Sequence, residues 1–268
     1  MIEIRNLTAV PFEAMTAAFN EAFSDYDIPA HYTTDYLRAL VTRRGYRPDL
    51  AVGAFDDERL VAFVFNCLDG DAAYNSGTGV VPSHRRHGLA RTLMERSFAA
   101  TAAAGAKSYT LEVIETNHRA HALYRSVGMK ETRRFQCWKY EPTTRGRFTE
   151  LANVHLADYT PWFDFPPSWQ NSSAAIQRAI EPYVALGDDR CVAIVFPSNG
   201  DVPLLAVAPA YRRTGLGRSL LDACATRAAK PLRILNIDDR ASGAMAFLEG
   251  CGAVRTVEQY EMVISLPV

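Results

Sequence analysis

Two short loops rich in arginine and glycine contain the residues best suited to hold a phosphate. The first lies within GVVPSHRRHGLA at residues 79–90, and the second lies within AVAPAYRRTGLG at residues 206–217. Each follows an apolar strand segment and precedes an amphipathic helix, whose first N–H groups lack partners and attract anions. The small residues let a phosphate approach the backbone, and the arginines add charge. The pattern favours a pyrophosphate site, although one such hexad alone also fits an ordinary strand-to-helix turn.

The two loops belong to an internal repeat. Gly88 and Gly215 are 127 residues apart, as are the prolines and arginines that precede them. Further along, ALYRSVGM at residues 122–129 is echoed by AFLEGCGA at residues 246–253. Solenoid repeats have periods of about 20–50 residues, so this longer period indicates a duplicated domain instead.

Hydrophobic periodicity and turn residues predict an α/β fold in each copy. In the first copy we expect strands at 2–6, 50–55, 60–68, 72–81, 108–114 and 131–140, with helices at 11–24, 33–44, 86–104 and 117–127. In the second copy we expect a helix at 172–186 and strands at 191–196 and 202–208. The polar, turn-prone segment 141–147 separates the copies, which gives domains at 1–142 and 143–268.

The first loop, together with LEVIETN at residues 111–117 and ALYRSVGM at residues 122–129, resembles the GCN5-related N-acetyltransferase (GNAT) superfamily and its R/Q-x-x-G-x-G/A motif. The resemblance spans most of residues 50–140, and a fainter version spans about 190–265. It implies two tandem GNAT-like domains, each a mixed, mostly antiparallel sheet flanked by helices. The second domain is the shorter one, and we interpret it as degenerate.

This resemblance implies acetyl-CoA or another acyl-CoA as donor and an amine as acceptor. It also implies a sheet that opens between the strands at 72–81 and 108–114, where the pantetheine arm inserts. The cofactor-binding residues expected from it are Val80, Val81, Arg85, Arg86, His87, Gly88, Leu89, Ala90 and Asn117. The acceptor, a small molecule or a peptide, and the length of the acyl chain stay open.

Tyr124 is the expected catalytic residue, because the resemblance places a tyrosine of this position near the CoA sulfur. A phenol with a pKa of about 10 can donate its proton to a leaving thiolate whose conjugate acid has a pKa near 8.5. A core aromatic residue is the alternative interpretation of Tyr124. Asn117 is expected to cap the helix that contains Tyr124.

The general base is less clearly marked, because no acidic residue lies in the strand before the first loop. Glu112 is the nearest candidate, although a water chain or an already neutral amine would also serve. Asp25 and Asp27 lie in a turn between the first two helices and fit either a contact with a cationic amine or a solvated turn, which we favour.

The second copy departs from the first where the chemistry is expected. Leu248 stands at the position of Tyr124, and Ala241 stands at the position of Asn117. Leucine cannot donate a proton, so we predict catalysis in the first copy and a mainly structural role for the second. A non-catalytic acyl-CoA-binding or regulatory protein is the alternative. A nucleotide-binding protein of another fold is disfavoured, since the loops lack GKS/T and a complete GxGxxG.

Composition limits the remaining possibilities. The 268 residues include 48% hydrophobic and 22% charged residues with a formal net charge of −1, which is typical of a globular protein and disfavours a nucleic-acid partner bound through bulk charge. No apolar run is long enough for a membrane helix. Five scattered cysteines and the absence of a signal-like start favour the cytoplasm. The histidine pairs lack further ligands, so we expect no metal. The chain could also form a homodimer.

Overall fold

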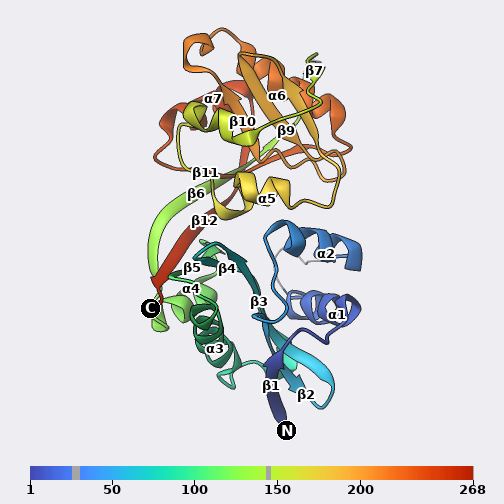
Figure 1. Cartoon of the computed structure of the whole chain (residues 1–268), viewed down its shortest axis with the longest axis vertical. Coiled ribbons are helices and arrows are strands. Elements are labelled where there is room, and N and C mark those ends of the chain that lie inside the picture. The colour runs from blue at the N-terminus through green and yellow to red at the C-terminus, as the bar shows by residue number, and fades with distance from the viewer. Residues whose placement is uncertain (26–30, 143–145, 268) are drawn as a thin grey trace. The chain divides into compact units, whose positions relative to one another are not determined.

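The structure is a computed structural model that describes residues 1–25, 31–142 and 146–267. These residues form two compact units, one made of 1–132 and 261–268 and the other of 133–260. The units interleave along the chain (Figure 1). Strands β6 (Lys130–Tyr140) and β12 (Val254–Ser265), which end the two sequence repeats, each contribute residues to both units.

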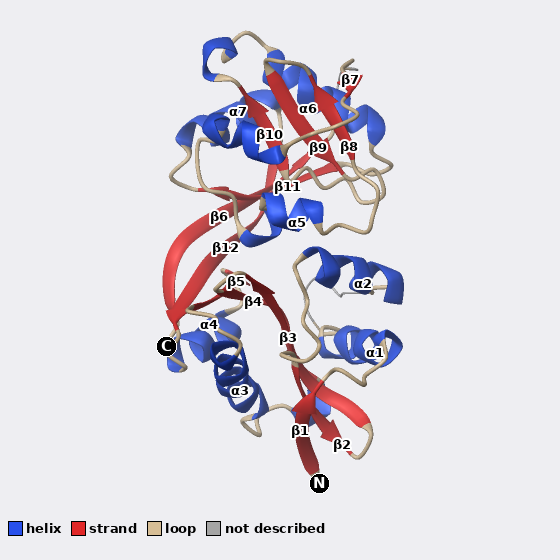
Figure 2. Cartoon of the chain, viewed as in Figure 1, coloured by secondary structure: helices blue, strands red, loops and turns tan. Residues whose placement is uncertain are grey.

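The first unit is a mixed sheet with helices on both faces (Figures 1 and 2). Its strands are β1 (Ile2–Asn6), β2 (Val52–Asp56), β3 (Arg59–Asp69), β4 (Ala72–Val80) and β5 (Ser108–Ile114), in that order across the sheet. Its helices are α1 (Phe12–Ala22), α2 (Thr34–Arg43), α3 (Leu89–Ala103) and α4 (His118–Ser126). Neighbouring strands from β1 to β4 are antiparallel, and β4 and β5 are parallel. This is the predicted α/β architecture.

The second unit repeats the same plan with fewer helices. Its strands include β7 (Thr149–Glu150), β8 (Val184–Gly187), β9 (Cys191–Val195), β10 (Leu204–Val207) and β11 (Leu232–Asp238). Its α-helices are α5 (Ser173–Gln177), α6 (Leu216–Arg227) and α7 (Ser242–Cys251). Strands β7 to β10 form one antiparallel sheet, and β11 pairs with β6.

Two element predictions were wrong in their bounds. The helix expected at 172–186 ends at Gln177, and Val184–Gly187 is a strand instead. Pro182 explains the break, because a proline lacks the N–H of a helical hydrogen bond and disfavours helical geometry in the residue before it. The helix expected to start at residue 86 starts at Leu89, since Arg86 has a left-handed φ of 66° and Gly88 one of 76°.

In each unit two neighbouring parallel strands separate after a short contact. Strand β4 pairs with β5 only from Ala72 to Tyr74, although β4 continues to Val80. In the second unit the equivalent contact is a single bridge between Asp201 and Arg233, just before β10 begins. The sheet therefore opens where the sequence predicted, and the loop that follows each first strand lies at the end of this opening.

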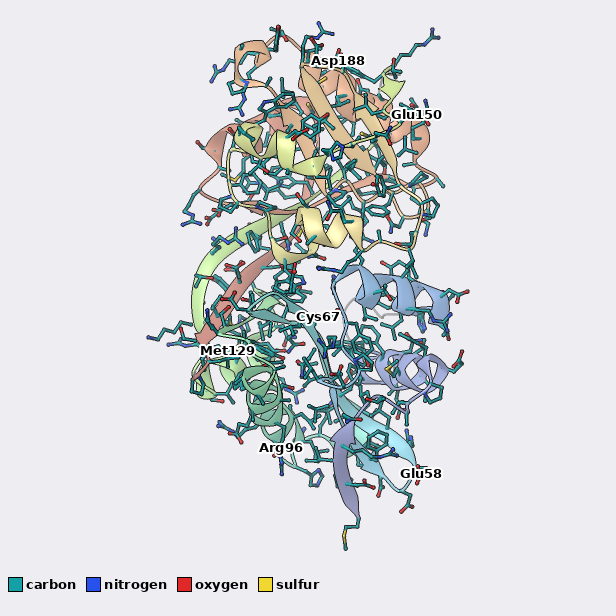
Figure 3. All side chains as sticks on the ribbon, in the orientation of Figure 1. Glu58, Cys67, Arg96, Met129, Glu150 and Asp188 are labelled. Carbon is teal, nitrogen blue, oxygen red and sulfur yellow. The ribbon has the colours of Figure 1, made fainter. Side chains whose placement is uncertain are left out.

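Aromatic residues make up much of the buried core of the first unit. In the first unit, aromatic side chains of β3 and α1 stack, with the ring centroids of Phe63 and Phe65 4.4 Å apart and those of Phe19 and Phe63 5.8 Å apart. Cys67 at the end of this run is fully buried (Figure 3). Within the described residues, no helix has the length and apolar character to cross a membrane.

Gly79 lets α1 pack closely on β4 directly before the first loop. A Cβ atom at Gly79 would lie 2.4 Å from the Phe63 ring and 2.9 Å from Ala22 Cβ, so we expect Gly79→Val to lower the free energy of unfolding by about 1–3 kcal/mol through overpacking. Gly77→Ala is the matched control, because a Cβ there lies 3.5 Å from its nearest neighbour. Chemical denaturation followed by circular dichroism measures both, and equal stability of the two variants would contradict this packing.

Candidate functional site

The two arginine-glycine loops have the same backbone conformation. Arg86 and Arg213 have left-handed φ values of 66° and 62°, and Gly88 and Gly215 follow with 76° and 89°. Each loop begins with a single 3₁₀ turn, and each glycine is the N-cap of the next helix, α3 or α6. A Cβ atom at either glycine would meet nothing within 4 Å. The space in front of both helix N-termini is therefore open, as a phosphate site requires.

The side chain of Arg85 stabilises the first loop through hydrogen bonds and an ion pair within the protein. Its guanidinium donates to the carbonyl of Val80 (3.1 Å) and that of Ala22 (2.9 Å), and it binds both carboxylate oxygens of Asp25 at 2.5 and 2.8 Å. This bidentate pair lowers the pKa of Asp25. Asp25 is thus an exposed turn residue that is paired with Arg85, and Asp27 lies outside the described residues.

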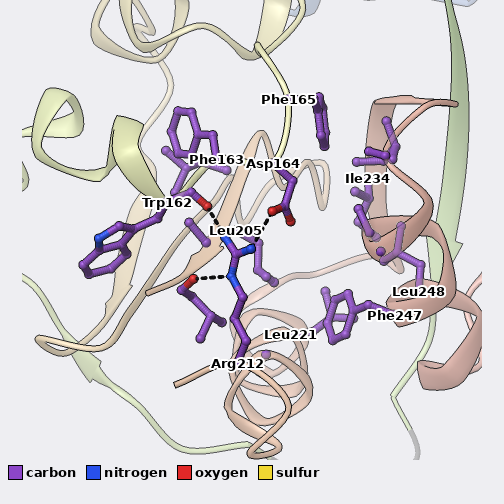
Figure 4. A pocket seen from close by; sticks show the side chains of 18 of the residues that line it. Trp162, Phe163, Asp164, Phe165, Leu205, Arg212, Leu221, Ile234, Phe247 and Leu248 are labelled. Atoms are coloured by element: carbon purple, nitrogen blue, oxygen red, sulfur yellow. Dashed lines mark hydrogen bonds and ion pairs between the residues drawn. The ribbon is translucent and has the colours of Figure 1, made fainter. Parts of the chain in front are cut away.

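Arg212 makes the same brace in the second unit. It donates to the carbonyl of Val207 (3.1 Å), the carbonyl of Trp162 (2.8 Å) and the carboxylate of Asp164 (2.6 Å) (Figure 4). Asp164 therefore plays the part that Asp25 plays in the first unit. The first arginine of each loop, Arg85 or Arg212, therefore stabilises the fold of its own unit.

The adjacent arginines are the ones available to a ligand. Arg86 and Arg213 are exposed, and neither has an ion-pair partner among the described residues. Their left-handed backbone follows the braced arginine and precedes the helix N-terminus. Of the two arginines in each loop, Arg86 and Arg213 are thus the ones that no carboxylate of the described residues neutralises.

The other predicted loop residues lie at the base and rim of the first opening. Val81 is fully buried, and its N–H donates to the Val61 carbonyl at 2.9 Å. His87 is exposed, with its Nδ1 3.4 Å from the His84 carbonyl. Leu89 and Ala90 form the first turn of α3, where the N–H groups have no partner within the helix.

Asn117 caps α4, as the sequence predicted. Its Oδ1 accepts a hydrogen bond from the N–H of Ala120 at 3.1 Å. Ala241 stands at the same place before α7 with nearly the same backbone, φ −83° and ψ 64° against −83° and 66°, but it has no side-chain acceptor. The second copy has kept the geometry of the cap and lost its hydrogen bond.

Tyr124 and Leu248 occupy equivalent sites on α4 and α7. Both are buried, and in each helix their carbonyl accepts the N–H of the residue that follows the terminal glycine, at 3.1 and 3.0 Å. Tyr124 lies near Tyr109 of β5, whose pKa is raised well above its usual value by burial and, to a smaller extent, by Tyr124. Tyr124 is thus brought to the strand that borders the opening of the first unit.

Glu112 is part of a buried polar cluster in the same opening. The Tyr74 hydroxyl donates to Glu112 at 3.1 Å, and burial together with the nearby Glu112 raises the pKa of Tyr74 well above its usual value. Burial lowers the pKa of the Arg44 guanidinium, but several nearby groups, Tyr74 and Glu112 foremost, raise it, and the overall shift is upward. Arg44 also donates to the carbonyl (3.1 Å) and the hydroxyl (3.2 Å) of Ser76.

A β-bulge in β4 brings this cluster to the edge of the opening. The register with β3 shifts between the pairs Val64 with Thr78 and Asn66 with Asn75, which leaves one extra residue in β4 at Ser76–Gly77. The side chain of Asn75 accepts the N–H of Gly77 at 2.9 Å. Strand β10 pairs with β9 in continuous register over its four residues, so the described part of the second unit has no counterpart of this bulge.

The second unit contains a cavity of about 860 Å³ at its opening (Figure 4). Its walls come from β10, β11, α6, α7 and the segment 162–167, and they are mainly apolar. Labelled lining residues are Trp162, Phe163, Phe165, Leu205, Leu221, Ile234, Phe247 and Leu248. Arg213, Arg218 and Gly215 place the loop and the start of α6 at its border.

One further pair of equivalent arginines, Arg91 and Arg218, was not predicted from the sequence. Arg91 of α3 donates to the carbonyl (3.3 Å) and the hydroxyl (2.7 Å) of Ser126 at the end of α4. Arg218 of α6 donates in the same way to the carbonyl of Gly250 at the end of α7. These arginines join the two helices that border each opening. Their 127-residue spacing, equal to that of the loops, was the available signal.

Two of the six histidines lie beside acidic residues. His84 lies 3.3 Å from Asp56, and His121 lies 2.8 Å from Glu131. Across residues 1–25, 31–142 and 146–267, no group of three or more His, Cys, Asp or Glu residues has the arrangement of a metal site.

Comparison with known proteins identifies the fold of both units. Residues 12–129 and 148–253 each match the sequence model of the acetyltransferase (GNAT) family. A GCN5-related N-acetyltransferase from Sphaerobacter thermophilus has the same fold, with a TM-score of 0.71 at 14% identity over 98% of this chain and 95% of that chain. A tandem GNAT protein from the clavulanic acid biosynthesis pathway gives a TM-score of 0.67 at 12% identity over 100% and 99% of the two chains. A search of curated proteins found no matching relative.

The matched caps give a stability test in both directions. Asn117→Ala should lower the free energy of unfolding by about 1 kcal/mol, because it removes the side-chain acceptor at the start of α4. Ala241→Asn should raise it by a similar amount, because the backbone there already has the conformation of Asn117. Chemical denaturation of both variants measures the effect. A destabilising Ala241→Asn would contradict the equivalence of the two caps.

Proposed function

The chain belongs to the acetyltransferase (GNAT) family, and we propose that its first unit transfers an acetyl or similar acyl group from an acyl-CoA to a primary amine. Three features of the first unit together support this assignment. They are the open loop before α3, the buried Tyr124 on α4, and the polar cluster of Tyr74 and Glu112 on the strands. The second unit retains the loop but has Leu248 in place of the tyrosine and no bulge in the paired part of β10.

The loop residues fit the diphosphate of CoA. Arg86 supplies a guanidinium that has no ion-pair partner within residues 1–25, 31–142 and 146–267, and the first N–H groups of α3 supply donors. Gly88 leaves the approach open, because a Cβ there would have no neighbour within 4 Å. Val80, Val81, Leu89 and Ala90 form the base of this site, and Asn117 holds the start of α4 beside it. Acyl-CoA supplies the thioester, whose carbonyl carbon is the electrophile.

In the proposed reaction the amine nitrogen forms a bond with the thioester carbon, and the C–S bond then breaks. Tyr124 donates its hydroxyl proton to the departing sulfur, a transfer for which a phenol near a thiolate is suited. Glu112 is the proposed acceptor of the proton that the amine loses. Tyr74 positions this carboxylate by its 3.1 Å hydrogen bond, and Arg44 holds the cluster to the bulged strand through Ser76.

The acceptor that we propose is an amine of a small molecule or of a peptide. The opening of the first unit contains the carboxylate of Glu112 near the position of the attacking nitrogen, which suits an amine that arrives protonated. Asp25 is engaged by Arg85 and does not contribute.

Removal of the Tyr124 hydroxyl should separate catalysis from binding. Tyr124→Phe keeps the buried ring but loses the proton donor, so kcat should fall roughly 10²–10⁴-fold while KM for acetyl-CoA changes little. Steady-state release of CoA thiol against a panel of amines measures this. Leu248→Phe is the control in the second unit and should leave kcat near the wild-type value. Unchanged kcat in Tyr124→Phe would eliminate Tyr124 as the proton donor.

Glu112→Gln tests the proposed base through its pH profile. A general base is active only when deprotonated, so wild-type kcat/KM should rise with pH through the pKa of this group, and Glu112→Gln should abolish that rise and lower kcat/KM at neutral pH roughly 10²-fold or more. Tyr74→Phe should alter the position of the rise without abolishing it. If Glu112→Gln keeps the wild-type profile and lowers only thermal stability, Glu112 is a structural residue.

A further inference from the structure

The sheet of the first unit contains a second buried glutamate, which the second sequence repeat supplies. Glu261 of β12 belongs to this unit and is only 7% exposed. Its Oε2 accepts a hydrogen bond from the hydroxyl of Thr132 at 2.7 Å. Strand β12 is the neighbour of β5, the strand of Glu112. A second carboxylate therefore lies on the strand next to that of the proposed base.

The pairing of β5 with β12 places Glu261 opposite Glu112. The N–H of Leu266, directly after β12, donates to the carbonyl of Lys107, directly before β5, at 2.8 Å. A bond between the end of one strand and the start of the other makes the two strands antiparallel. Five residues further in along each strand, this register reaches Glu112 and Glu261. Residues opposite each other in such a pair have Cβ atoms about 4.5–5.5 Å apart.

The second unit has the same two positions in contact. At the 124-residue spacing that relates α4 to α7, Glu112 corresponds to Asn236. Glu261 corresponds at the same spacing to Cys137. The Cys137 thiol donates to the side-chain oxygen of Asn236 over 3.6 Å. The contact is thus a feature of the repeated fold, and the first unit has two carboxylates where the second has a thiol and an amide.

Both carboxylates point to the face of the sheet opposite α3 and α4. Ile264 faces α4, since its Cδ1 would lie 3.2 Å from a Cβ at Gly128, which follows that helix. Tyr109 faces α3, where the ring of Phe98 lies 4.9 Å from its own. Side chains alternate between the two faces along a strand. Each glutamate is three positions from one of these residues and therefore points to the other side.

Other elements on that face supply the groups around the pair. The Tyr74 hydroxyl of β4 donates to Glu112 at 3.1 Å. The Arg44 guanidinium at the end of α2 interacts electrostatically with Tyr74 and Glu112. The remaining groups that act on this guanidinium are Tyr32 and Cys67. Hydroxyl donors on β4 and β6 thus orient the two carboxylates within the opening of the first unit.

The proton balance of amide formation gives a second carboxylate a use. A basic amine is protonated near neutral pH, and an ammonium nitrogen must lose two protons to become an amide nitrogen. The first must leave before the lone pair can attack, and the second leaves after attack. The departing sulfur takes one proton from Tyr124, whose phenol must then be restored. A single carboxylate accepts only one of the two protons from nitrogen.

We propose that Glu261 is a second proton acceptor of the first unit, which takes the first proton of an ammonium substrate, while Glu112 takes the second. The N–H bond breaks toward Glu261, its electron pair stays on nitrogen, and this pair forms the bond to the thioester carbon. One of the two protons then restores the Tyr124 phenol, and the other passes to solvent. The assignment rests on the proposed function of the first unit, and it makes the acceptor a basic aliphatic amine.

Two acceptors of similar size and different basicity test this role. Ethylamine is protonated near neutral pH, whereas trifluoroethylamine is largely neutral because its fluorine atoms withdraw electrons. Glu261→Gln keeps an oxygen for the Thr132 hydroxyl but takes up no proton. It should lower kcat/KM for ethylamine roughly 10²-fold, and that for trifluoroethylamine less than about threefold. Release of CoA thiol by the full chain at saturating acetyl-CoA measures both.

Two further variants separate proton transfer from structure. Glu131→Gln is the matched control, because this glutamate lies 2.8 Å from His121 of α4, on the other face. It should leave the rates with both amines near the wild-type values. Glu261→Asp keeps a carboxylate and should retain more activity toward ethylamine than Glu261→Gln does. Circular dichroism checks that each variant is folded.

The pH profile of the wild type tests the proposal without any variant. If Glu261 deprotonates the ammonium, kcat/KM for ethylamine should level off well below the pKa of ethylamine. A continuous tenfold rise per pH unit up to that pKa would show that only the neutral amine reacts, which overturns the proposal.

Equal effects of Glu261→Gln on the two amines, or no effect on either, would also overturn it and leave Glu261 a structural residue. Glu261→Asp no more active toward ethylamine than Glu261→Gln would do the same. Failure of the proposed function is distinct, because the wild-type protein would then transfer acetyl groups to neither amine.

Discussion

Each unit is organised by one constraint, the separation of two parallel strands that begin side by side. Backbone groups beyond the last shared pair need other partners, because unpaired polar groups in the interior are costly. In the first unit Arg85 satisfies the Val80 carbonyl and ties it to α1 and to Asp25. Arg212 does the same for Val207. The opening therefore requires an arginine at its end, and that arginine fixes the loop in front of the helix.

The loops, the order of elements in the first copy and the cap at Asn117 were predictable, because each depends on local chemistry that repeats after a fixed spacing. The structural role of Arg85 was not predictable. Asp25 lies 60 residues away in the sequence, and the other two partners are backbone carbonyls, which every residue has. The prediction of a helix at 172–186 was wrong because it gave more weight to the spacing of apolar residues than to Pro182. The bulge at Ser76–Gly77 was also invisible, since only pairing with β3 reveals the extra residue.

Around their openings the two units differ by exchanges of volume and polarity between equivalent helices. Ala90 and Leu123 of the first unit correspond to Gly217 and Phe247 of the second, where the missing methyl group makes room for the larger ring. Compensation of this kind preserves packing between the helices, as close-packed interiors require. At the 127-residue spacing Thr78 of β4 corresponds to Leu205 of β10, and the paired residues of β10 lack the bulge of β4. The second unit has thus kept the loop and the separation of its strands, and it has Leu248 where the first unit has Tyr124.

The retained loop is the strongest physical sign that the second opening is used. A left-handed backbone at a residue other than glycine costs about 1 kcal/mol or more. Both Arg86 and Arg213 have this strained conformation. A unit kept only for packing gains nothing from that strain, and it could relax the loop as it lost the cap at Ala241. An anion bound at the helix N-terminus would stabilise this strained loop, because Arg213 has no ion-pair partner within the residues that the structure describes.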